Sequence, residues 1–206
     1  MKRRTLWAGL AGTAAVATGV AIWAIQPHDT AAPESKAVSE ASRTVEANAL
    51  LQAARLQSQY QDPKGATRTY RRVLELDPDN KIAWYNLGVI AQQAGRTTDA
   101  RSAYDEALKI DPKYPSALFN KAVLLKSSEP DRAMGLLNRA IEADPKAATA
   151  HLQLGQLLVK KGRDEEAKEA FHRAVAADPS LYTHVPEPFR NEVNPSPKSS
   201  QAGDNE

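Results

Sequence analysis

The chain has 206 residues, of which 42% are hydrophobic and 25% are charged, and this composition is typical of a soluble domain with an appended segment. It contains no cysteine, which excludes disulfide frameworks, thiolate metal sites and thiol nucleophiles. Three of the 27 basic residues are Lys2, Arg3 and Arg4, which leaves 24 basic and 25 acidic residues in the rest of the chain. This nearly neutral part of the chain lacks the excess of basic residues that nucleic-acid binding requires.

An uncharged segment follows the basic residues 1–4. It covers residues 5–25, and a helix of 21 residues is roughly 31 Å long, close to the ~30 Å hydrocarbon core of a bilayer. Trp7 and Trp23 stand near its two ends, where indole rings prefer the headgroup level, and the basic residues before it should stay cytoplasmic. We therefore expect a transmembrane helix (a signal anchor) over residues 5–25, with the remainder of a single-pass protein outside the cytoplasm.

A cleaved secretory signal is the alternative interpretation of the same segment. Such signals have a shorter apolar region and a small-x-small cleavage site, whereas this run is long and ends in Ile22-Trp23-Ala24-Ile25-Gln26-Pro27. We favour a retained anchor in a bacterial membrane over a secreted or periplasmic product. Placement in a bacterium rests on the anchor alone, and an organellar membrane stays open.

Residues 26–37 contain Pro27 and Pro33 among small polar residues, which is typical of a linker. Apolar residues at Val38, Ala41 and Val45 then predict a helix that runs into the following region.

The middle of the chain repeats one unit. The dipeptide Asp-Pro recurs with spacings of 34, 33 and 34 residues, at Asp77, Asp111, Asp144 and Asp178. Twelve, eight and five residues before each proline stand small, large and small apolar side chains, as in Ala100, Tyr104 and Ala107 of the second unit. Offsets of four and three residues place all three on one face of a helix. The pattern predicts about four helical hairpins.

Glycines mark where the paired helices meet and turn. Gly88 and Gly155 lie on the first helix of the second and fourth units, and we expect them to allow a close helix crossing with the small Ala100 and Ala167 opposite. Gly95 and Gly162 predict the turns within these hairpins, and each Asp-Pro ends a second helix.

These residues resemble the tetratricopeptide repeat (TPR) family. The resemblance is closest in the second and fourth units, at Trp84, Leu87, Gly88, Ala100, Tyr104 and Pro112 and at Gly155, Ala167, Phe171 and Pro179. It departs in the third unit, where Lys121 and Ala122 replace the usual leucine and glycine. The resemblance implies an all-α, right-handed superhelical solenoid of about four helix-turn-helix repeats. These are residues 47–80, 81–114, 115–147 and 148–181, in a domain over 38–179 that the transmembrane helix precedes.

The resemblance also implies a groove lined by the first helices, in which family members hold a partner peptide. Carrying the groove positions over gives a first row at Leu51, Tyr85, Phe119 and Leu152 and a second at Arg55, Val89, Val123 and Gln156. Beside them runs a row of carboxamides, Gln52, Asn86, Asn120 and Gln153, which could bond the backbone of an extended segment. We expect Tyr85 and Phe119 to be the partner anchors.

Less specific roles for the same residues stay open. Asn86 and Asn120 could satisfy neighbouring helix backbones, and Leu51 and Leu152 could pack adjacent repeats. The family's basic clamp for a terminal carboxylate is incomplete at Leu51, Arg55, Asn86, Ser116 and Asn120, which disfavours an adaptor for chaperone tails.

No catalytic motif is present: HExxH, GxSxG, GxGxxG and GxxxxGK are all missing. The histidines are His28, His151, His172 and His184, and neither His151 nor His172 has a carboxylate or a second histidine at metal-ligand spacing. His151 occupies the place of Trp84, so we expect it to be a core-flanking aromatic substitute. The sequence thus predicts no enzyme, cofactor, metal site or small-molecule substrate.

After Pro179 the chain is rich in proline and polar residues, and we expect residues 180–206 to be a mostly disordered tail. Only Leu181, Tyr182, Val185 and Phe189 are then available to shield the last hairpin, which predicts an exposed end with a tendency to self-association.

The function expected from these observations is that of a membrane-anchored scaffold for protein-protein interaction, which binds a protein or peptide through its TPR groove. A self-assembling structural protein is the alternative.

Overall fold

The computed structural model describes residues 31–193; residues 1–30 and 194–206 lie outside the described part. The expected transmembrane helix over 5–25 therefore falls on undescribed residues. None of the helices between residues 31 and 193 combines the length and the apolar character of a membrane span.

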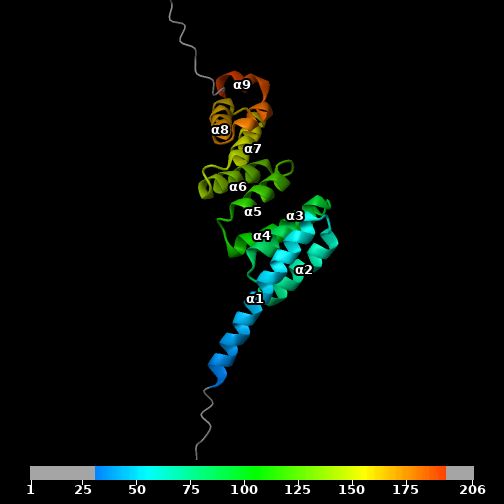
Figure 1. The fold of residues 1–206 in the computed structure, drawn as a ribbon. Coiled ribbons are helices and arrows are strands. Elements are labelled where there is room, and N and C mark those ends of the chain that lie inside the picture. Colours follow the sequence, from blue (N-terminus) through cyan, green and yellow to red (C-terminus); the bar gives the residue numbers. More distant parts are fainter. Residues whose placement is uncertain (1–30, 194–206) are drawn as a thin grey trace, which may run out of the picture.

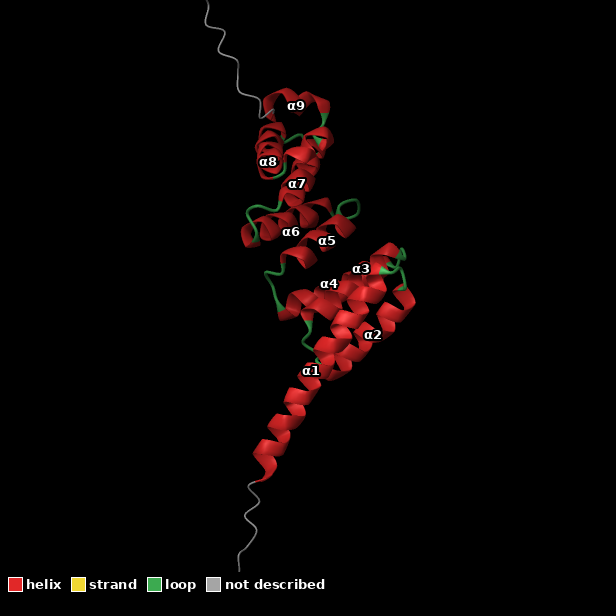
Figure 2. Cartoon of the chain, viewed as in Figure 1, coloured by secondary structure: helices red, strands yellow, loops and turns green. Residues whose placement is uncertain are grey.

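Eight α-helices form four hairpins that stack along one axis (Figure 1). Their bounds are α1 Ala31–Gln59, α2 Pro63–Leu76, α3 Lys81–Gln93, α4 Thr97–Ile110, α5 Pro115–Leu125, α6 Pro130–Ala143, α7 Ala148–Lys160 and α8 Asp164–Ala177. A 3₁₀-helix η1, Pro179–His184, and a short helix α9, Glu187–Val193, follow. Each odd-numbered helix packs on the helix after it, and each hairpin contacts the next (Figure 2). Within residues 31–193 the fold is entirely helical, which confirms a TPR-like solenoid.

Local sequence chemistry sets the helix ends. Prolines open α2, α5 and α6, where a missing N–H costs nothing. The Asp62 and Asn80 side chains cap α2 and α3 by accepting from the N–H groups of Gly65 and Ala83 at 2.8 and 3.0 Å. These signals place the starts of α3 and α5 at residues 81 and 115, and α7 starts at residue 148 without a proline or a side-chain cap. All three starts are the residues where the repeats were expected to begin.

The turns follow the same logic. Gly95 and Gly162 have φ of +73° and +70°, a region that favours glycine, at the turns where the sequence placed them. At the end of α4 the Asp111 carboxylate accepts from the Lys113 N–H at 3.0 Å, and proline at the intervening position prevents the helix from continuing.

Helix α1 begins earlier than expected. Residues 31–37 were assigned to a linker, but they form the first two turns of α1. Pro33 lies within the first turn, where proline is compatible with a helix.

The close helix crossings involve different partners from those expected. A Cβ atom added to Gly88 would lie 2.5 Å from Cε1 of Tyr104, and one on Gly155 would lie 2.5 Å from Cε1 of Phe171. The aromatic rings, and not Ala100 or Ala167, are therefore nearest to the glycines. A ring lies flat against bare backbone only where the facing residue lacks a side chain.

The C-terminal segment is also different from the prediction of a mostly disordered tail. Residues 179–193 fold onto α8 as η1 and α9, and Leu181, Val185, Phe189 and Val193 join the core around Phe171. Phe189 packs on Phe171 with ring centroids 5.3 Å apart. The last hairpin is therefore covered, and residues 194–206 of the predicted tail lie outside the described range.

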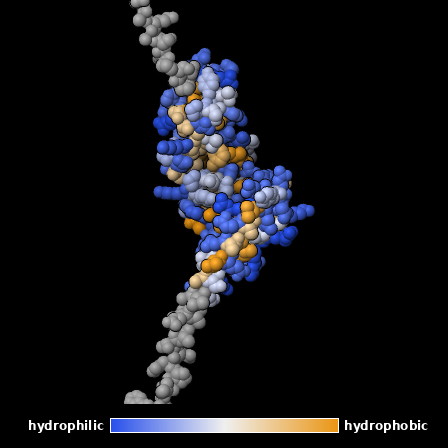
Figure 3. All heavy atoms as spheres, in the orientation of Figure 1, coloured by the Kyte–Doolittle hydropathy of each residue, from blue (hydrophilic) through white to orange (hydrophobic). Residues whose placement is uncertain are grey.

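The open apolar face lies at the other end of the stack. Val45 and Leu56 on α1 and Tyr60 directly after it are 69%, 53% and 78% exposed, and a hydrophobic band runs along α1 in Figure 3. Leu56 corresponds in repeat register to Ile90, which is buried against the preceding hairpin. No hairpin precedes α1 within the described residues, so this face stays in solvent.

The third repeat accommodates its unusual lysine through an ion pair. Lys121 takes the place of Leu87, its side chain is only 6% exposed, and its ammonium pairs with the Asp105 carboxylate on α4. A buried cation needs such a partner because desolvation of an unpaired charge is costly.

Two tyrosines at equivalent positions differ in their hydrogen bonding. Tyr104 and Tyr70 are both fully buried, and the Tyr104 hydroxyl donates to Gln92 Oε1 at 2.8 Å. The residue corresponding to Gln92 in the first repeat is Ser58, whose hydroxyl donates to the Ala54 carbonyl at 3.0 Å. Among residues 31–193, the Tyr70 hydroxyl consequently has no hydrogen-bond partner in its buried position.

We expect Tyr70→Phe to raise the free energy of unfolding by about 1 kcal/mol, because it removes an unsatisfied buried hydroxyl and keeps the ring. The matched change Tyr104→Phe should lower the free energy of unfolding by about 1 kcal/mol, because it removes a buried hydroxyl that is hydrogen-bonded. Urea unfolding of both variants measures the difference. If both variants changed the free energy of unfolding in the same direction, the difference in hydrogen bonding between Tyr70 and Tyr104 would be wrong.

Candidate functional site

The first helices of the repeats lie side by side and form one face of the stack, here called the first-helix face. Hydrogen bonds join them: Asn120 Nδ2 of α5 donates to the Tyr85 hydroxyl of α3 at 2.8 Å, and Lys126 Nζ of α5 donates to Gln153 Oε1 of α7 at 3.3 Å. The expected groove residues of the second, third and fourth repeats are therefore brought together.

A tyrosine cluster occupies this face between the second and third repeats. The Tyr85 ring is 5.4 Å from Tyr114, edge on, and 6.1 Å from Tyr104. Lys81 Nζ lies 5.3 Å from the centre of the Tyr114 ring and 2.5 Å from the Asp111 carboxylate. Tyr85 and Tyr114 are half-buried, so part of each ring remains accessible.

Burial raises the pKa of Tyr85, Tyr104 and Tyr114 above the usual tyrosine value. All three hydroxyls therefore stay protonated at neutral pH. The hydrogen bond from the Lys81 ammonium lowers the pKa of Asp111, which keeps this carboxylate ionised.

The two expected groove rows separate into buried and accessible residues. Leu51 and Leu152 are only 6% and 5% exposed and belong to the cores of the first and last repeats, so they are unavailable to a partner. They had been placed in the groove because register alone does not distinguish a lining residue from a packing residue. Half-buried or exposed members of the rows are Tyr85, Phe119, Arg55, Val89, Val123 and Gln156.

The row of carboxamides is mostly engaged within the chain. Asn86 Nδ2 donates to the Ile82 carbonyl of its own helix at 2.7 Å, and Asn120 and Gln153 make the bonds between first helices described above. Gln52 is exposed. Asn86 thus takes the alternative role of bonding a helix backbone, and a ladder that binds a partner's backbone stays a prediction.

His151 fills the place of Trp84 as expected. Its Nε2 lies 3.1 Å from the Pro145 carbonyl, and Trp84 Nε1 donates to the Pro78 carbonyl at 3.0 Å. Because a carbonyl only accepts, Nε2 of His151 carries the proton. Within residues 31–193, no cluster of three or more histidine and carboxylate side chains could hold a metal ion.

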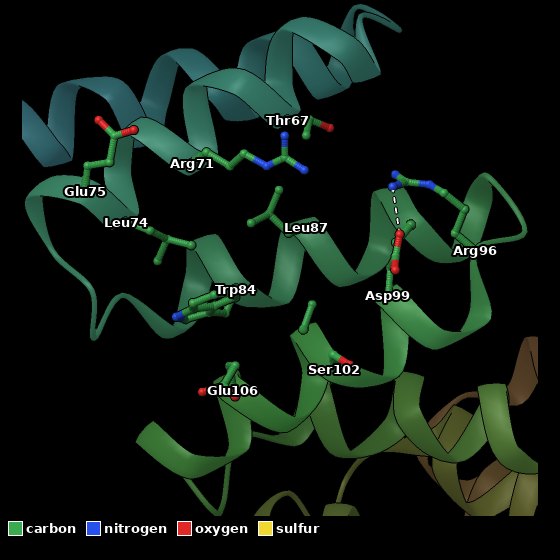
Figure 4. A pocket seen from close by; sticks show the side chains of 12 residues that line it. Thr67, Arg71, Leu74, Glu75, Trp84, Leu87, Arg96, Asp99, Ser102 and Glu106 are labelled. Atoms are coloured by element: carbon green, nitrogen blue, oxygen red, sulfur yellow. Dashed lines mark hydrogen bonds and ion pairs between the residues drawn. The ribbon is translucent and has the colours of Figure 1, made fainter.

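Hollows also lie on the opposite side, between second helices of neighbouring repeats, and the repeat pattern did not predict them. One of about 710 Å³ lies between α2 and α4, with α3 as its floor (Figure 4). Another of about 400 Å³ lies between α6 and α8, with α7 as its floor. The sequence did contain a signal for the hollow between α2 and α4. Lys64, Arg68 and Arg71 form a basic ridge on one face of α2, and the other second helices lack such a ridge.

Comparison with known sequences agrees with the helical repeats. Sequence models of the tetratricopeptide repeat match residues 45–115 and 124–183. The chain belongs to the tetratricopeptide repeat family. The human protein O-mannosyl-transferase TMTC3 is 30% identical over 119 residues, which are 55% of this chain and 13% of that protein. The rat mitochondrial import receptor subunit TOM70 is 23% identical over 158 residues, 71% of this chain and 26% of that one.

Solved TPR structures are similar in fold. YrrB, described as a TPR protein with an unusual peptide-binding site, has a TM-score of 0.60 and 25% identity, covering 72% of this chain and 76% of its own. The type IV pilus biogenesis factor PilW has a TM-score of 0.60 and 27% identity, and the match covers 66% of this chain and 64% of the PilW chain. This chain spans only a small part of the sequence relatives that it matches, so their activities do not transfer with the repeats.

Proposed function

We propose that this TPR protein is a scaffold for protein-protein interaction, which residues 5–25 hold in a membrane with the repeats on the extracytoplasmic side. One observation carries the binding function: the first-helix face is continuous across three repeats and presents the half-buried rings of Tyr85, Tyr114 and Phe119. Partly exposed aromatic rings on such a face supply contact area at a low cost in side-chain entropy. The peptide-binding site named for YrrB supports this use of the fold.

The membrane part of the proposal rests on the sequence. The uncharged residues 5–25 follow three basic residues, and this charge bias favours a cytoplasmic amino terminus. The cleaved signal and the self-assembling structural protein stay alternative predictions.

The test compares partner capture by the wild type and by a variant with Tyr85→Leu and Phe119→Leu. The sequence suggested exposed anchors, but both rings are half-buried, so leucine is preferred to alanine because it keeps apolar volume in the core. We expect the variant to lose at least about tenfold in crosslinked partner, a loss of ~1.4 kcal/mol of binding energy, while its circular dichroism is kept. Capture is measured from membranes that contain the full chain.

Tyr60→Ala is the matched control, because Tyr60 is 78% exposed and lies outside the first-helix face. Equal capture by the double variant and the wild type would reject the first-helix face. Release of the full chain from membranes by carbonate would reject the anchor and leave the binding result unaffected.

A further inference from the structure

The hollow between α2 and α4 continues into a second hollow of about 600 Å³ at the end of the first two hairpins. Thr67, Arg71 and Arg96 line both, so the two form one groove on the second-helix side. In Figure 4 Arg71 extends from α2 over Leu87, and Arg96 lies at the end of the groove.

The floor of this α2–α4 groove is apolar. Trp84, Leu87 and Ala91 of α3 lie beneath the first hollow, and Ile90 and Ala94 lie beneath the second. Trp84 and Leu87 are only half-buried, so they present apolar surface to whatever enters.

The rim carries cations without partners. Lys64, Arg68 and Arg71 follow one another at i, i+4 and i+7 on one face of α2, and all three are exposed. Within residues 31–193 none of them forms an ion pair, whereas the neighbouring Arg72 pairs with Glu46 and Glu75.

Carboxylates near the groove are already engaged. Asp99 pairs with Arg96 at 3.0 Å, Glu106 with Lys109 at 2.5 Å, and Glu75 with Arg72 at 2.7 Å. Asp62, next to the start of α2, accepts from the Gly65 N–H. This bond does not neutralise the charge of Asp62, but Lys64, Arg68 and Arg71 carry three positive charges against it, so the uncompensated charge of the groove is positive.

The repeat fold does not require these cations. The positions that correspond to Lys64, Arg68 and Arg71 hold Thr98, Ser102 and Asp105 in α4, Asp131, Gly135 and Asn138 in α6, and Glu165, Glu169 and His172 in α8. Lys64 also lies in the first turn of α2, where the helix dipole disfavours a positive charge. The first turns of α4, α6 and α8 carry acidic residues instead.

The equivalent hollow between α6 and α8 lacks unpaired cations of this kind. Glu165, Glu166, Glu169 and Arg173 line it above His151 and Leu154, and the three glutamates pair with Lys168, Arg163 and Arg173. The same position in the fold thus carries a basic rim at one end of the stack and paired charges at the other.

We propose that the α2–α4 groove binds an acidic peptide segment of a partner protein. Its carboxylates pair with Lys64, Arg68 and Arg71, and its apolar side chains contact Trp84 and Leu87. Arginine suits this role because its guanidinium can bond a carboxylate with two parallel N–H groups. This surface is additional to the first-helix face and does not depend on it.

A peptide fits the groove better than a nucleic acid does. The basic ridge extends only about 10 Å along α2, and its floor is apolar. The described part of the chain is nearly neutral, with 23 basic and 22 acidic residues, whereas nucleic-acid binding needs an extended basic surface.

The test is fluorescence anisotropy of the full chain in detergent micelles with a labelled peptide of sequence Glu-Leu-Glu-Asp-Leu-Glu-Glu-Leu. The comparison probes are the same peptide with lysine at each acidic position and a single-stranded oligonucleotide of equal charge. We expect the acidic peptide to bind the wild type, and added salt to weaken its binding.

The decisive variant carries Lys64→Glu, Arg68→Glu and Arg71→Glu, and we expect it to bind the acidic peptide at least about tenfold more weakly, since like charges then face each other. The matched control carries Lys113→Glu, Lys146→Glu and Lys160→Glu, which are exposed cations outside the groove and give the same net charge. Its affinity should change by less than about twofold.

Circular dichroism checks that both variants remain helical. Equal weakening in the two variants, absence of binding by the wild type, or tighter binding of the oligonucleotide would each overturn the proposal. The double substitution at Tyr85 and Phe119 should leave binding of the acidic peptide unchanged. The experiments can therefore reject binding at the α2–α4 groove without rejecting binding at the first-helix face, and the reverse.

Discussion

Deletion of residues 181–206 is expected to destabilise the protein by about 3 kcal/mol or more and to cause self-association. The deletion removes Phe189 from the ring of Phe171 and also removes Leu181, Val185 and Val193 from the core of the last repeat. Loss of a buried aromatic contact alone costs about 3–5 kcal/mol. Phe171 and Val175 would then face solvent at the end of the stack, where an apolar patch favours contact between copies.

Deletion of residues 194–206 is the matched control, because the chain then ends after Val193 and the cap remains. Thermal unfolding measures the stability, and light scattering at increasing protein concentration measures association. If both truncated chains behave alike, η1 and α9 have no capping role.

Gly88→Leu is expected to destabilise the protein by about 3 kcal/mol or more. The first side-chain carbon would lie 2.5 Å from Cε1 and 2.6 Å from Cδ1 of Tyr104, and because this ring is fully buried, the ring or helix α3 would have to shift. Gly88→Ala already meets this contact, so we expect a smaller loss in the same direction. Urea unfolding of both variants measures the series.

Gly135 provides the control within a helix. No atom lies within 4 Å of a Cβ added there, so Gly135→Ala should stabilise by about 0.5–1 kcal/mol through helix propensity. An unchanged unfolding midpoint for Gly88→Leu would show that the register between α3 and α4 is wrong.

The two faces of the stack present different side chains to a partner. On the first-helix face, tyrosines and amides are partly used to join repeats, and what remains for a partner is half-buried aromatic surface. On the second-helix side, the α2–α4 groove has an apolar floor and three exposed cations that pair with no carboxylate of residues 31–193. A scaffold with both could hold two different segments at once.

The repeat, its period and most helix boundaries could be predicted from the order of residues alone. Asp-Pro ends, glycine turns and proline starts act within a few residues, so the positions of α3, α5 and α7 could be predicted without knowledge of the fold. The substitution of His151 for Trp84 could also be predicted, because register in a repeat protein transfers the environment of one unit to the next.

Which side chains at equivalent repeat positions are accessible depends on how the repeats pack. Leu51 and Leu152 occupy the same row as Tyr85 and Phe119, yet the leucines are buried in the first and last repeats and the rings are half exposed. Asn86 bonds its own helix while Asn120 bonds the neighbouring repeat, a difference that depends on the Tyr85 hydroxyl 35 residues away.

Long-range contacts also decided the two ends of the fold and the groove. Residues 179–193 have weak helix signals and fold because Phe171 and Val175 offer them a surface to bury against. The ridge of α2 meets Arg96 only when the first two hairpins stack, so its role as a groove rim was not visible in the order of residues. Local chemistry determines where helices start and stop, and burial between distant segments determines which of their side chains a partner can reach.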